Sequence, residues 1–311
     1  MRELSAEGLE LLATIERDGM QESFHHGVVA VVDPDGNLIS SKGDVFALIY
    51  PRSALKPVQA SAMKAAGLSL SEAQRVMTMA SHYATEQQVG LVAAILASQS
   101  VSEEKLGCPE ALPWNSEARI GASPKRIQMN CSGKHAGFLA TSKLNGWDLD
   151  SYLAPEHPMQ LLVKQRVEEL SGEKIERNST DGCGAPLYAL STHGLAKAVS
   201  NFAQQEPELV SAAISHPDLI GDVETPDSGF LRAGLFSKLG AEGVFTVATN
   251  SGHGLAMKIA DGSLRMAATY SAVLLRRLGL ITESQMTLAI ATEKTEVKGG
   301  DQVIGGWEFY F

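Results

Sequence analysis

The sequence lacks the features that mark membrane-spanning, exported or repetitive proteins. Its 311 residues contain no uninterrupted apolar run of about 18 residues, the length that a membrane-spanning helix requires. Residues 1–20 mix charges with short Leu pairs instead of forming the apolar segment of a secretory signal, so we expect no such signal. Neither a repeat nor a Pro/Gly/Ser-rich linker interrupts the chain, and we expect residues 1–311 to form a single domain.

Cysteine and basic residues are also scarce. Three cysteines, Cys108, Cys131 and Cys183, are too few for a disulfide framework in a chain of this length, and they predict a reducing, cytoplasmic location. Lys and Arg number 26 against 36 Asp and Glu, which gives a net charge of −10. Because binding to phosphates needs excess positive charge, this balance argues against nucleic acid or an anionic membrane as a partner. A small-molecule ligand is favoured.

The pattern of hydrophobic residues predicts an α+β fold. Hydrophobic residues make up 44% of the chain, enough for a large buried core. Runs typical of strands predict a hairpin in residues 25–49, apolar spacing of three and four residues predicts helices through 53–239, and strand-like runs return from residue 243. Thr85 followed by Gln88 is typical of a helix start. We therefore expect a mixed sheet built from both chain ends with a helical middle.

A serine and a lysine stand three residues apart at a predicted helix start. In "PRSALKP", residues 51–57, the spacing puts Ser53 and Lys56 on one helical face, and Pro57 suits the first turn. Lys56 could act as a base toward the serine hydroxyl only when neutral, so its pKa must fall well below the usual value of about 10.4. Burial or neighbouring cations such as Arg52 would lower it. The spacing fits a nucleophile with its base, and it also fits an ordinary polar helix face.

Another group of residues has the chemistry of a metal site. Cys131 and His135 in "NCSGKHAG" (130–137) lie four residues apart, and Cys183 in "STDGCGAP" (179–186) follows a glycine in a predicted turn. Two thiolates with an imidazole suit Zn²⁺, and three protein ligands would leave an open coordination position. The alternative is that both cysteines are small buried residues of the core.

Two more residues with reactive side chains lie outside these stretches. Ser81 precedes the helix that we expect after Thr85, and Lys258 stands among apolar residues in the strand-like run 255–262. A lysine on a central strand is partly desolvated, so its charge is costly unless it is used. An outward-facing lysine on a strand is the simpler interpretation.

Taken in order, these stretches resemble the signature blocks of the rhizobial-type L-asparaginases, also called the thermolabile or asparaginase II family. The resemblance implies a fold like that of the serine β-lactamases and penicillin-binding proteins, an L-asparagine amidohydrolase activity, zinc beside the pocket and a homodimer. Residues 83–86 and 218–240 depart from the family pattern and leave the substrate preference open. The matching blocks are "ESFHHG" (22–27), "RSALKPVQA" (52–60), "ASH" (80–82), "NCSGKHAG" (130–137), "DGCGAP" (181–186), "AEGV" (241–244) and "LAMKIADG" (255–262).

The resemblance also implies a role for each matching residue. It assigns the third metal position to Lys134 instead of His135, which then faces the substrate. We expect a Ser-Lys acyl-enzyme mechanism, with zinc as a modulator of substrate binding and not as the source of the nucleophile. The implied roles are catalysis for Ser53, Lys56, Ser81 and Lys258, substrate binding for Arg52, His135 and Asp181, and zinc ligation for Cys131, Lys134 and Cys183.

Three alternatives remain open at the level of sequence. The first is a serine amidohydrolase that acts on glutamine or on a β-lactam. The second is a non-catalytic, zinc-containing protein that binds an amino acid. The third is a zinc-held structural or interaction module. If zinc proves essential for turnover, a zinc hydrolase in which Cys131, Cys183 and His135 hold a metal-bound water would replace the serine mechanism.

Overall fold

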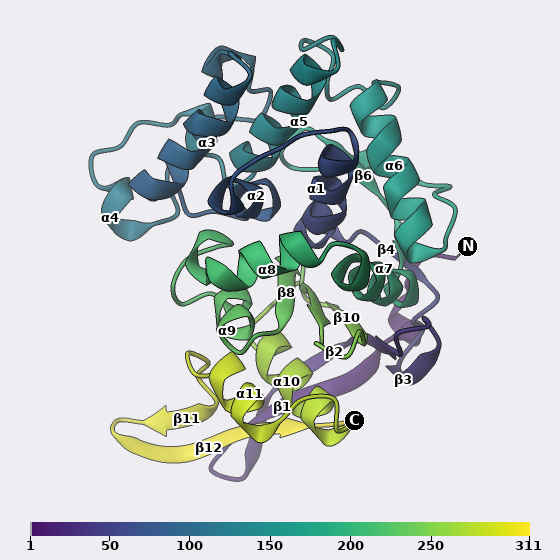
Figure 1. Ribbon diagram of the computed structural model, residues 1–311. Coiled ribbons are helices and arrows are strands. Elements are labelled where there is room, and N and C mark those ends of the chain that lie inside the picture. The colour runs from purple at the N-terminus through teal and green to yellow at the C-terminus, as the bar shows by residue number, and fades with distance from the viewer. Residues whose placement is uncertain (1) are drawn as a thin grey trace.

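One antiparallel sheet forms the centre of the structure, a computed structural model that describes residues 2–311 (Figure 1). The strand order is β11-β12-β1-β2-β10-β9-β8, and β3 pairs with the second half of the long strand β2. The strands are β1 (Glu10–Arg17), β2 (Met20–Val32), β3 (Leu38–Lys42), β8 (Phe236–Gly240), β9 (Val244–Ala248), β10 (Gly254–Ile259), β11 (Glu296–Gly299) and β12 (Gln302–Phe309).

The predicted α+β fold, with a sheet from both chain ends and a helical middle, is confirmed. The prediction that this sheet is mixed is wrong, because each of its described ladders is antiparallel. The reason lies in the connections: short turns join β1 to β2, β8 to β9, β9 to β10 and β11 to β12, and a short turn can join only antiparallel neighbours.

Helices cover both faces of the sheet. Those of the middle of the chain are α1 (Lys56–Ala65), α2 (Glu72–Met79), α3 (Glu86–Ser98), α4 (Ser116–Arg119), α5 (Ser132–Leu144), α6 (Pro158–Ser171), α7 (Thr192–Gln205), α8 (Pro207–Ser215) and α9 (Pro226–Arg232). Towards the C-terminus lie α10 (Ala267–Arg277) and α11 (Glu283–Ala289), and small two-stranded ladders join β4 (Leu48–Ile49) to β7 (Leu190–Ser191) and β5 (Asn178–Thr180) to β6 (Pro186–Tyr188). No helix within residues 2–311 combines the length and apolar character needed to cross a bilayer.

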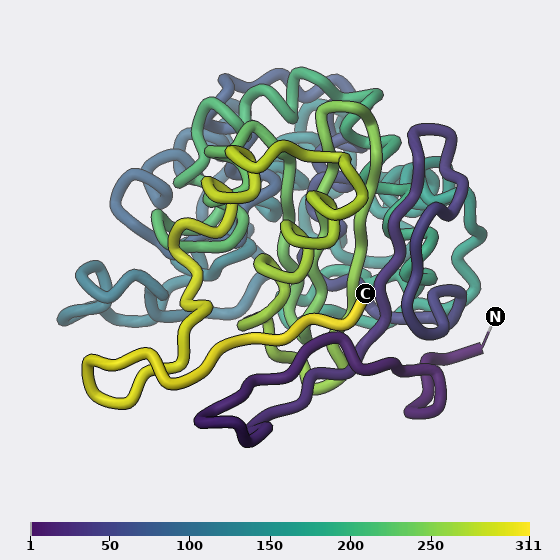
Figure 2. The backbone as a smooth tube through the Cα atoms, turned by 90° about the horizontal axis from the view of Figure 1, so that it is seen from below, coloured from purple at the N-terminus to yellow at the C-terminus, as the bar shows by residue number. Residues whose placement is uncertain are grey.

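Strand alternation divides the core into two layers. Helix α7 packs on β2, β9 and β10 and separates the sheet from the upper group of α1, α2, α3, α5 and α6, whereas α10 packs on the opposite face (Figure 1). In β10, Ala256 belongs to the core on the α7 side, and Leu255 and Met257 belong to the core on the α10 side, as the two-residue period of a strand requires. Seen from below, the β1–β2 and β11–β12 hairpins project beyond the helices (Figure 2).

The predicted helix start at Thr85 is confirmed. The Thr85 hydroxyl accepts from the backbone N–H of Gln88, and the Gln88 side chain accepts from the backbone N–H of Thr85, which is a complete capping box for α3.

Candidate active site

Ser53 lies in η2 (Arg52–Leu55), a 3-10 helix between β4 and α1. Arg52 has a φ of 53°, a left-handed conformation that costs a non-glycine residue about 1 kcal/mol or more. The chain therefore turns sharply just before the serine. Gly240 of β8 packs so closely on this corner that a Cβ atom there would lie 2.4 Å from the Pro51 carbonyl oxygen. The edge strand thus fixes the position of Ser53, which is 9% exposed.

Lys56 begins α1 and buries its amino group among oxygen acceptors. Its Nζ donates to the carbonyl oxygen of Ala80 at 2.6 Å, to the Ser81 hydroxyl at 3.1 Å and to the Asn130 carbonyl oxygen at 3.4 Å. The sequence pattern pairs Lys56 with Ser53, but in the structure its hydroxyl partner is Ser81. Ser81 is therefore the predicted serine that contacts Lys56, and Ser53 precedes this lysine by three residues in the chain.

The charge of Lys56 is disfavoured by its surroundings. Burial, assisted by the charges of Lys238 and Lys134, lowers the pKa of Lys56 to about 8, although Cys131 acts in the opposite direction. A substantial fraction of this side chain is then neutral near physiological pH, which is the condition for a lysine to act as a base.

Ser81 is held by a loop that is anchored at both ends. Its backbone N–H donates to the carbonyl oxygen of Ile220 at 2.8 Å. The buried Gln88 side chain accepts from the Thr85 backbone N–H at 3.1 Å and donates to the Gly221 carbonyl oxygen at 2.7 Å. Gln88 therefore ties the segment after Ser81 to the loop that carries Ile220.

His82, next to Ser81, has a structural role. Its Nδ1 accepts from the backbone N–H of Ala84 at 3.1 Å, so the ring proton sits on Nε2, 2.8 Å from the Ser132 hydroxyl. Burial, with the nearby charge of Lys56, lowers the pKa of His82 to about 3. His82 is therefore a neutral link between the Ser81 loop and α5, not a base.

The structure does not bring Lys258 to Ser81, so that predicted pair needs correction. Lys258 is half-buried in β10, and its Nζ donates to the carbonyl oxygen of its neighbour Ile259 at 2.5 Å. Burial lowers its pKa, and the charges that oppose this shift belong to Glu242 and Asp261. The physical reason is strand order: β10 lies two strands inside the edge strand β8 that borders η2.

Lys238 is the buried lysine of the edge strand, and it is absent from the residues predicted from the sequence. Its side chain is 0% exposed, its Nζ lies 2.9 Å from Asp227 Oδ2, and its charge is one of those that lower the pKa of Lys56. The available signal was a single charged residue within the short run "FSKLG", residues 236–240. That run matches the family pattern only loosely.

Cys131, Lys134 and Cys183 meet in one buried cluster. Cys131 and Lys134 flank the start of α5, and Lys134 Nζ donates to the Cys183 sulfur at 3.1 Å. The Cys131 thiol and the Lys134 ammonium lower the pKa of Cys183, while contact with Cys183 raises that of Cys131. The opposite directions of the two shifts fit a single proton shared by the cysteine pair beside the Lys134 ammonium.

His135 lies beside this cluster without completing it. Its Nδ1 is 2.6 Å from the Tyr152 hydroxyl, whereas its Nε2 is buried and has no hydrogen-bond partner among the described residues. Burial lowers the pKa of His135. Across residues 2–311, no three His, Cys, Asp or Glu side chains are placed to hold a metal ion. A metal at this cluster would therefore need Lys134 as a ligand.

Arg52 and Asp181, both predicted to bind substrate, form an ion pair. Arg52 Nε donates to Asp181 Oδ1 at 2.7 Å, and the backbone N–H of Gly182 donates to the same oxygen at 2.9 Å. Asp181 Oδ2 lies 3.8 Å from the Cys183 sulfur. The turn that carries Cys183 is thus connected directly to the residue before Ser53.

The glycines of "CSGKHAG" allow helices to pack closely. A Cβ atom at Gly133 would lie 2.2 Å from the Met77 carbonyl oxygen, and one at Gly137 would lie 2.5 Å from the Met63 sulfur. These contacts press α5 against α2 and α1, the helices that lead to Ser81 and from Lys56. The glycines therefore set the distance between the sulfur cluster and the serines.

We expect Gly133→Ala to destabilise the fold by about 1–3 kcal/mol or more, because a backbone carbonyl cannot move aside for the new methyl group. Thermal or urea unfolding measures the change. Gly90→Ala is the matched control, since a Cβ atom on this helical glycine of α3 would have no neighbour within 4 Å among residues 2–311. It should stabilise the protein by about 0.5–1 kcal/mol. Equal stability of the two variants would contradict the close packing of α5 on α2.

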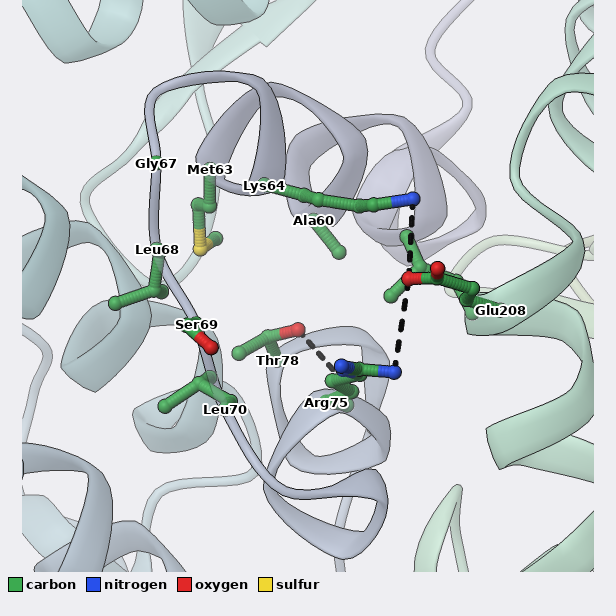
Figure 3. Close-up of a pocket in the computed structure, with 11 residues that line it drawn as sticks. Ala60, Met63, Lys64, Gly67, Leu68, Ser69, Leu70, Arg75, Thr78 and Glu208 are labelled. Atoms are coloured by element: carbon green, nitrogen blue, oxygen red, sulfur yellow. Dashed lines mark hydrogen bonds and ion pairs between the residues drawn. The ribbon is translucent and has the colours of Figure 1, made fainter.

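A separate cavity of about 230 Å³ lies between α1, α2 and α8 (Figure 3). Met63, Leu68 and Leu70 are among the apolar residues that line it, and none of the predicted site residues does. At its mouth the charges are mutually paired: Glu208 lies 3.4 Å from Lys64 and 3.8 Å from Arg75. The cavity is therefore distinct from the catalytic candidates.

Comparison with known proteins gives one family and distant structural similarities. Residues 13–309 match a family model described as L-asparaginase II. The chain is similar to a β-lactamase from Mycobacterium bovis (14% identity, TM-score 0.36, covering 81% of this chain and 94% of that one). It is also similar to a Bacillus glutaminase (12% identity, TM-score 0.32, covering 82% and 91%). No curated protein matches the sequence.

Proposed function

The chain belongs to the L-asparaginase II family of enzymes, and from this we propose that it hydrolyses L-asparagine to L-aspartate and ammonia with a serine nucleophile. The observation that supports the mechanism is the buried Lys56 side chain, which contacts Ser81 at 3.1 Å and follows Ser53 by three residues. A partly neutral lysine that contacts one serine hydroxyl and follows another serine by three residues can accept, hold and return one proton.

In the proposed reaction, Ser53 Oγ attacks the carbonyl carbon of the side-chain amide while its proton passes to neutral Lys56, directly or through the Ser81 hydroxyl. Lys56 then gives this proton to the leaving nitrogen, so that ammonia departs and an aspartyl ester of Ser53 remains. A water molecule next loses a proton to Lys56 and attacks the ester. The departing serine oxygen takes that proton back, which restores the enzyme.

Substrate binding is assigned to Arg52, Asp181 and His135. A guanidinium suits the α-carboxylate of the amino acid, and a carboxylate suits its α-ammonium. Because Arg52 and Asp181 are paired in the structure, the substrate would insert its two charges between them or beside them. Glutamine is longer by one methylene, a difference that pockets resolve by only about 1–3 kcal/mol. Ammonia release from both amides, with turnover of a β-lactam such as nitrocefin, tests the preference.

Zinc fits the sulfur cluster if Lys134 is one of its ligands. Cys131, Lys134 and Cys183 would hold the ion, with His135 Nε2 as a nearby nitrogen donor that has no partner among residues 2–311. When bound, zinc would supply a positive charge that keeps both cysteines as thiolates and Lys134 neutral. Burial acts against the charge of Lys134, but the two cysteines raise its pKa. Zinc binding would therefore release protons.

We expect chelation, or the change Cys183→Ser, to raise the KM for asparagine and to leave kcat within about tenfold. The reason is that Cys183 shares its turn with Asp181, whereas Ser53 and Lys56 belong to other elements. Steady-state kinetics with zinc analysis measures the effect, and Cys108→Ser is the matched control for a buried cysteine outside the cluster. A complete, zinc-reversible loss of kcat in a folded protein would favour the zinc hydrolase with Cys131, Cys183 and His135.

Three further points accompany this proposal: a non-catalytic alternative, the oligomeric state and the location in the cell. A non-catalytic amino-acid-binding protein remains the alternative of a different class, and absence of ammonia release despite asparagine binding would support it. The homodimer and the cytoplasmic location stay predictions, for which sedimentation analysis and cell fractionation are the tests.

A further inference from the structure

Lys238 and Asp227 form a fully buried ion pair between β8 and α9. Their side chains are 0% and 1% exposed, and Lys238 Nζ lies 2.9 Å from Asp227 Oδ2. The Ser237 hydroxyl donates to Asp227 Oδ1 at 3.0 Å, and Lys238 also donates to the Leu239 carbonyl oxygen at 3.0 Å. Both carboxylate oxygens therefore have a defined partner.

Such a pair is a poor source of stability, because removing two charges from water costs about as much as their attraction returns. Its strong effect is to fix a full positive charge at one place. Loss of the carboxylate alone would leave the ammonium buried and uncompensated. Asp227 therefore decides whether Lys238 can remain in place as a cation.

Lys238 lies on the same face of β8 as Gly240, the residue that packs against η2, the 3-10 helix that contains Ser53. Lys238 and Gly240 are two residues apart, so they project from the same face of the strand, about 7 Å apart along it. Gly240 is the residue that touches the Pro51 carbonyl oxygen and approaches the Ala54 nitrogen. Lys238 thus lies on the face of β8 that borders η2.

We propose that Asp227 is a positioning residue for the amide hydrolysis: it holds the Lys238 ammonium on the β8 face beside Ser53, where the tetrahedral intermediate carries negative charge. This inference rests on the proposed function. Preorganised positive groups at such a place commonly contribute about 10²–10³ in kcat. Asp227 acts through Lys238 and does not itself reach the reacting atoms.

Asp227→Asn tests the proposal, because it keeps the shape of the side chain and removes its charge. We expect kcat for asparagine to fall by about 10²–10³-fold, with KM nearly unchanged. Ser237→Ala is the matched control: it removes a hydrogen bond to the same carboxylate, leaves the ion pair intact and should retain kcat. A purely structural role would instead move the unfolding midpoint of both variants and spare kcat in the folded fraction.

A double variant keeps the test informative if Asp227→Asn folds poorly. Asp227→Asn combined with Lys238→Met removes both charges, which proteins commonly tolerate. Its kcat should equal that of Lys238→Met alone, since the carboxylate has nothing left to position. A further tenfold loss in the double variant, or an unchanged kcat in folded Asp227→Asn, overturns the inference. A wild type inactive on both asparagine and glutamine would instead refute the proposed function.

Discussion

Ser53→Ala should lower the rate of ammonia release from L-asparagine by about 10⁴–10⁶-fold, the loss typical of a missing nucleophile. Ser81→Ala should lower it by about 10²-fold, because it removes only a hydroxyl that passes a proton to Lys56. The two expected losses differ because the two serines lie in different places. Ser53 belongs to the segment that packs against the edge strand β8, whereas the Ser81 hydroxyl is hydrogen-bonded to Lys56. A coupled ammonia assay on the three proteins measures both effects.

The control for this comparison is Ser98→Ala, an exposed serine at the end of α3 that should retain full activity. A larger loss in Ser81→Ala than in Ser53→Ala would exchange their roles, with Ser81 as the nucleophile and Lys56 as its direct base. Activity that survives in both variants would exclude serine catalysis.

Lys56→Met should reduce kcat/KM by about 10²–10⁴-fold, the usual contribution of a general base. In the wild type, kcat/KM should rise with pH, reach half of its maximum near pH 8 and level off about one pH unit higher, because the neutral amine is the active form and the pKa of Lys56 is about 8. The variant should lack this rise. Lys64→Met, a partly exposed lysine on the same helix, is the control that should keep the wild-type pH profile.

The same lowered pKa has a consequence for stability. Between pH 8 and 10.5 the unfolded chain binds the Lys56 proton more tightly than the folded chain does, so this group favours folding increasingly as pH rises. The gain across the window is about 3 kcal/mol, and Lys56→Met should lack it. A wild type and variant with parallel stability curves from pH 7 to pH 10.5 would show that Lys56 titrates normally.

Local geometry made part of the site predictable from the sequence. Helical spacing places Lys134 near Cys131 and puts Lys56 one turn from Ser53, whatever the rest of the fold does. The contact between Cys183 and Lys134 needed the resemblance to a family, because no local rule joins residues so far apart. Spacing alone had selected His135 as the third ligand; in the structure its Nδ1 lies 2.6 Å from the Tyr152 hydroxyl, and its other ring nitrogen stays available for the hypothesis.

The choice between Lys258 and Lys238 could not be made from local pattern. Each lysine is the single charged residue of a short, largely buried strand. Only the order of strands in the sheet makes β8 the neighbour of η2. Asp227, the ion-pair partner of Lys238, could not be predicted from the sequence either. It lies in α9, and residues 218–240 match the family pattern only loosely.

The pairing of β1 with β12 joins the two ends of the chain, so the sheet is complete only after the C-terminal residues have been synthesised. Ala13 pairs with Phe309, and the strand that contacts the Pro51 carbonyl oxygen also belongs to the C-terminal third of the chain. Contacts between such distant segments form slowly because a long loop must close first. While the chain emerges from the ribosome, β1 lacks its partner β12, β2 lacks its partner β10, and Ser53 lacks its neighbouring strand β8. We expect nascent chains that stop before β8 to depend on chaperones and to remain inactive.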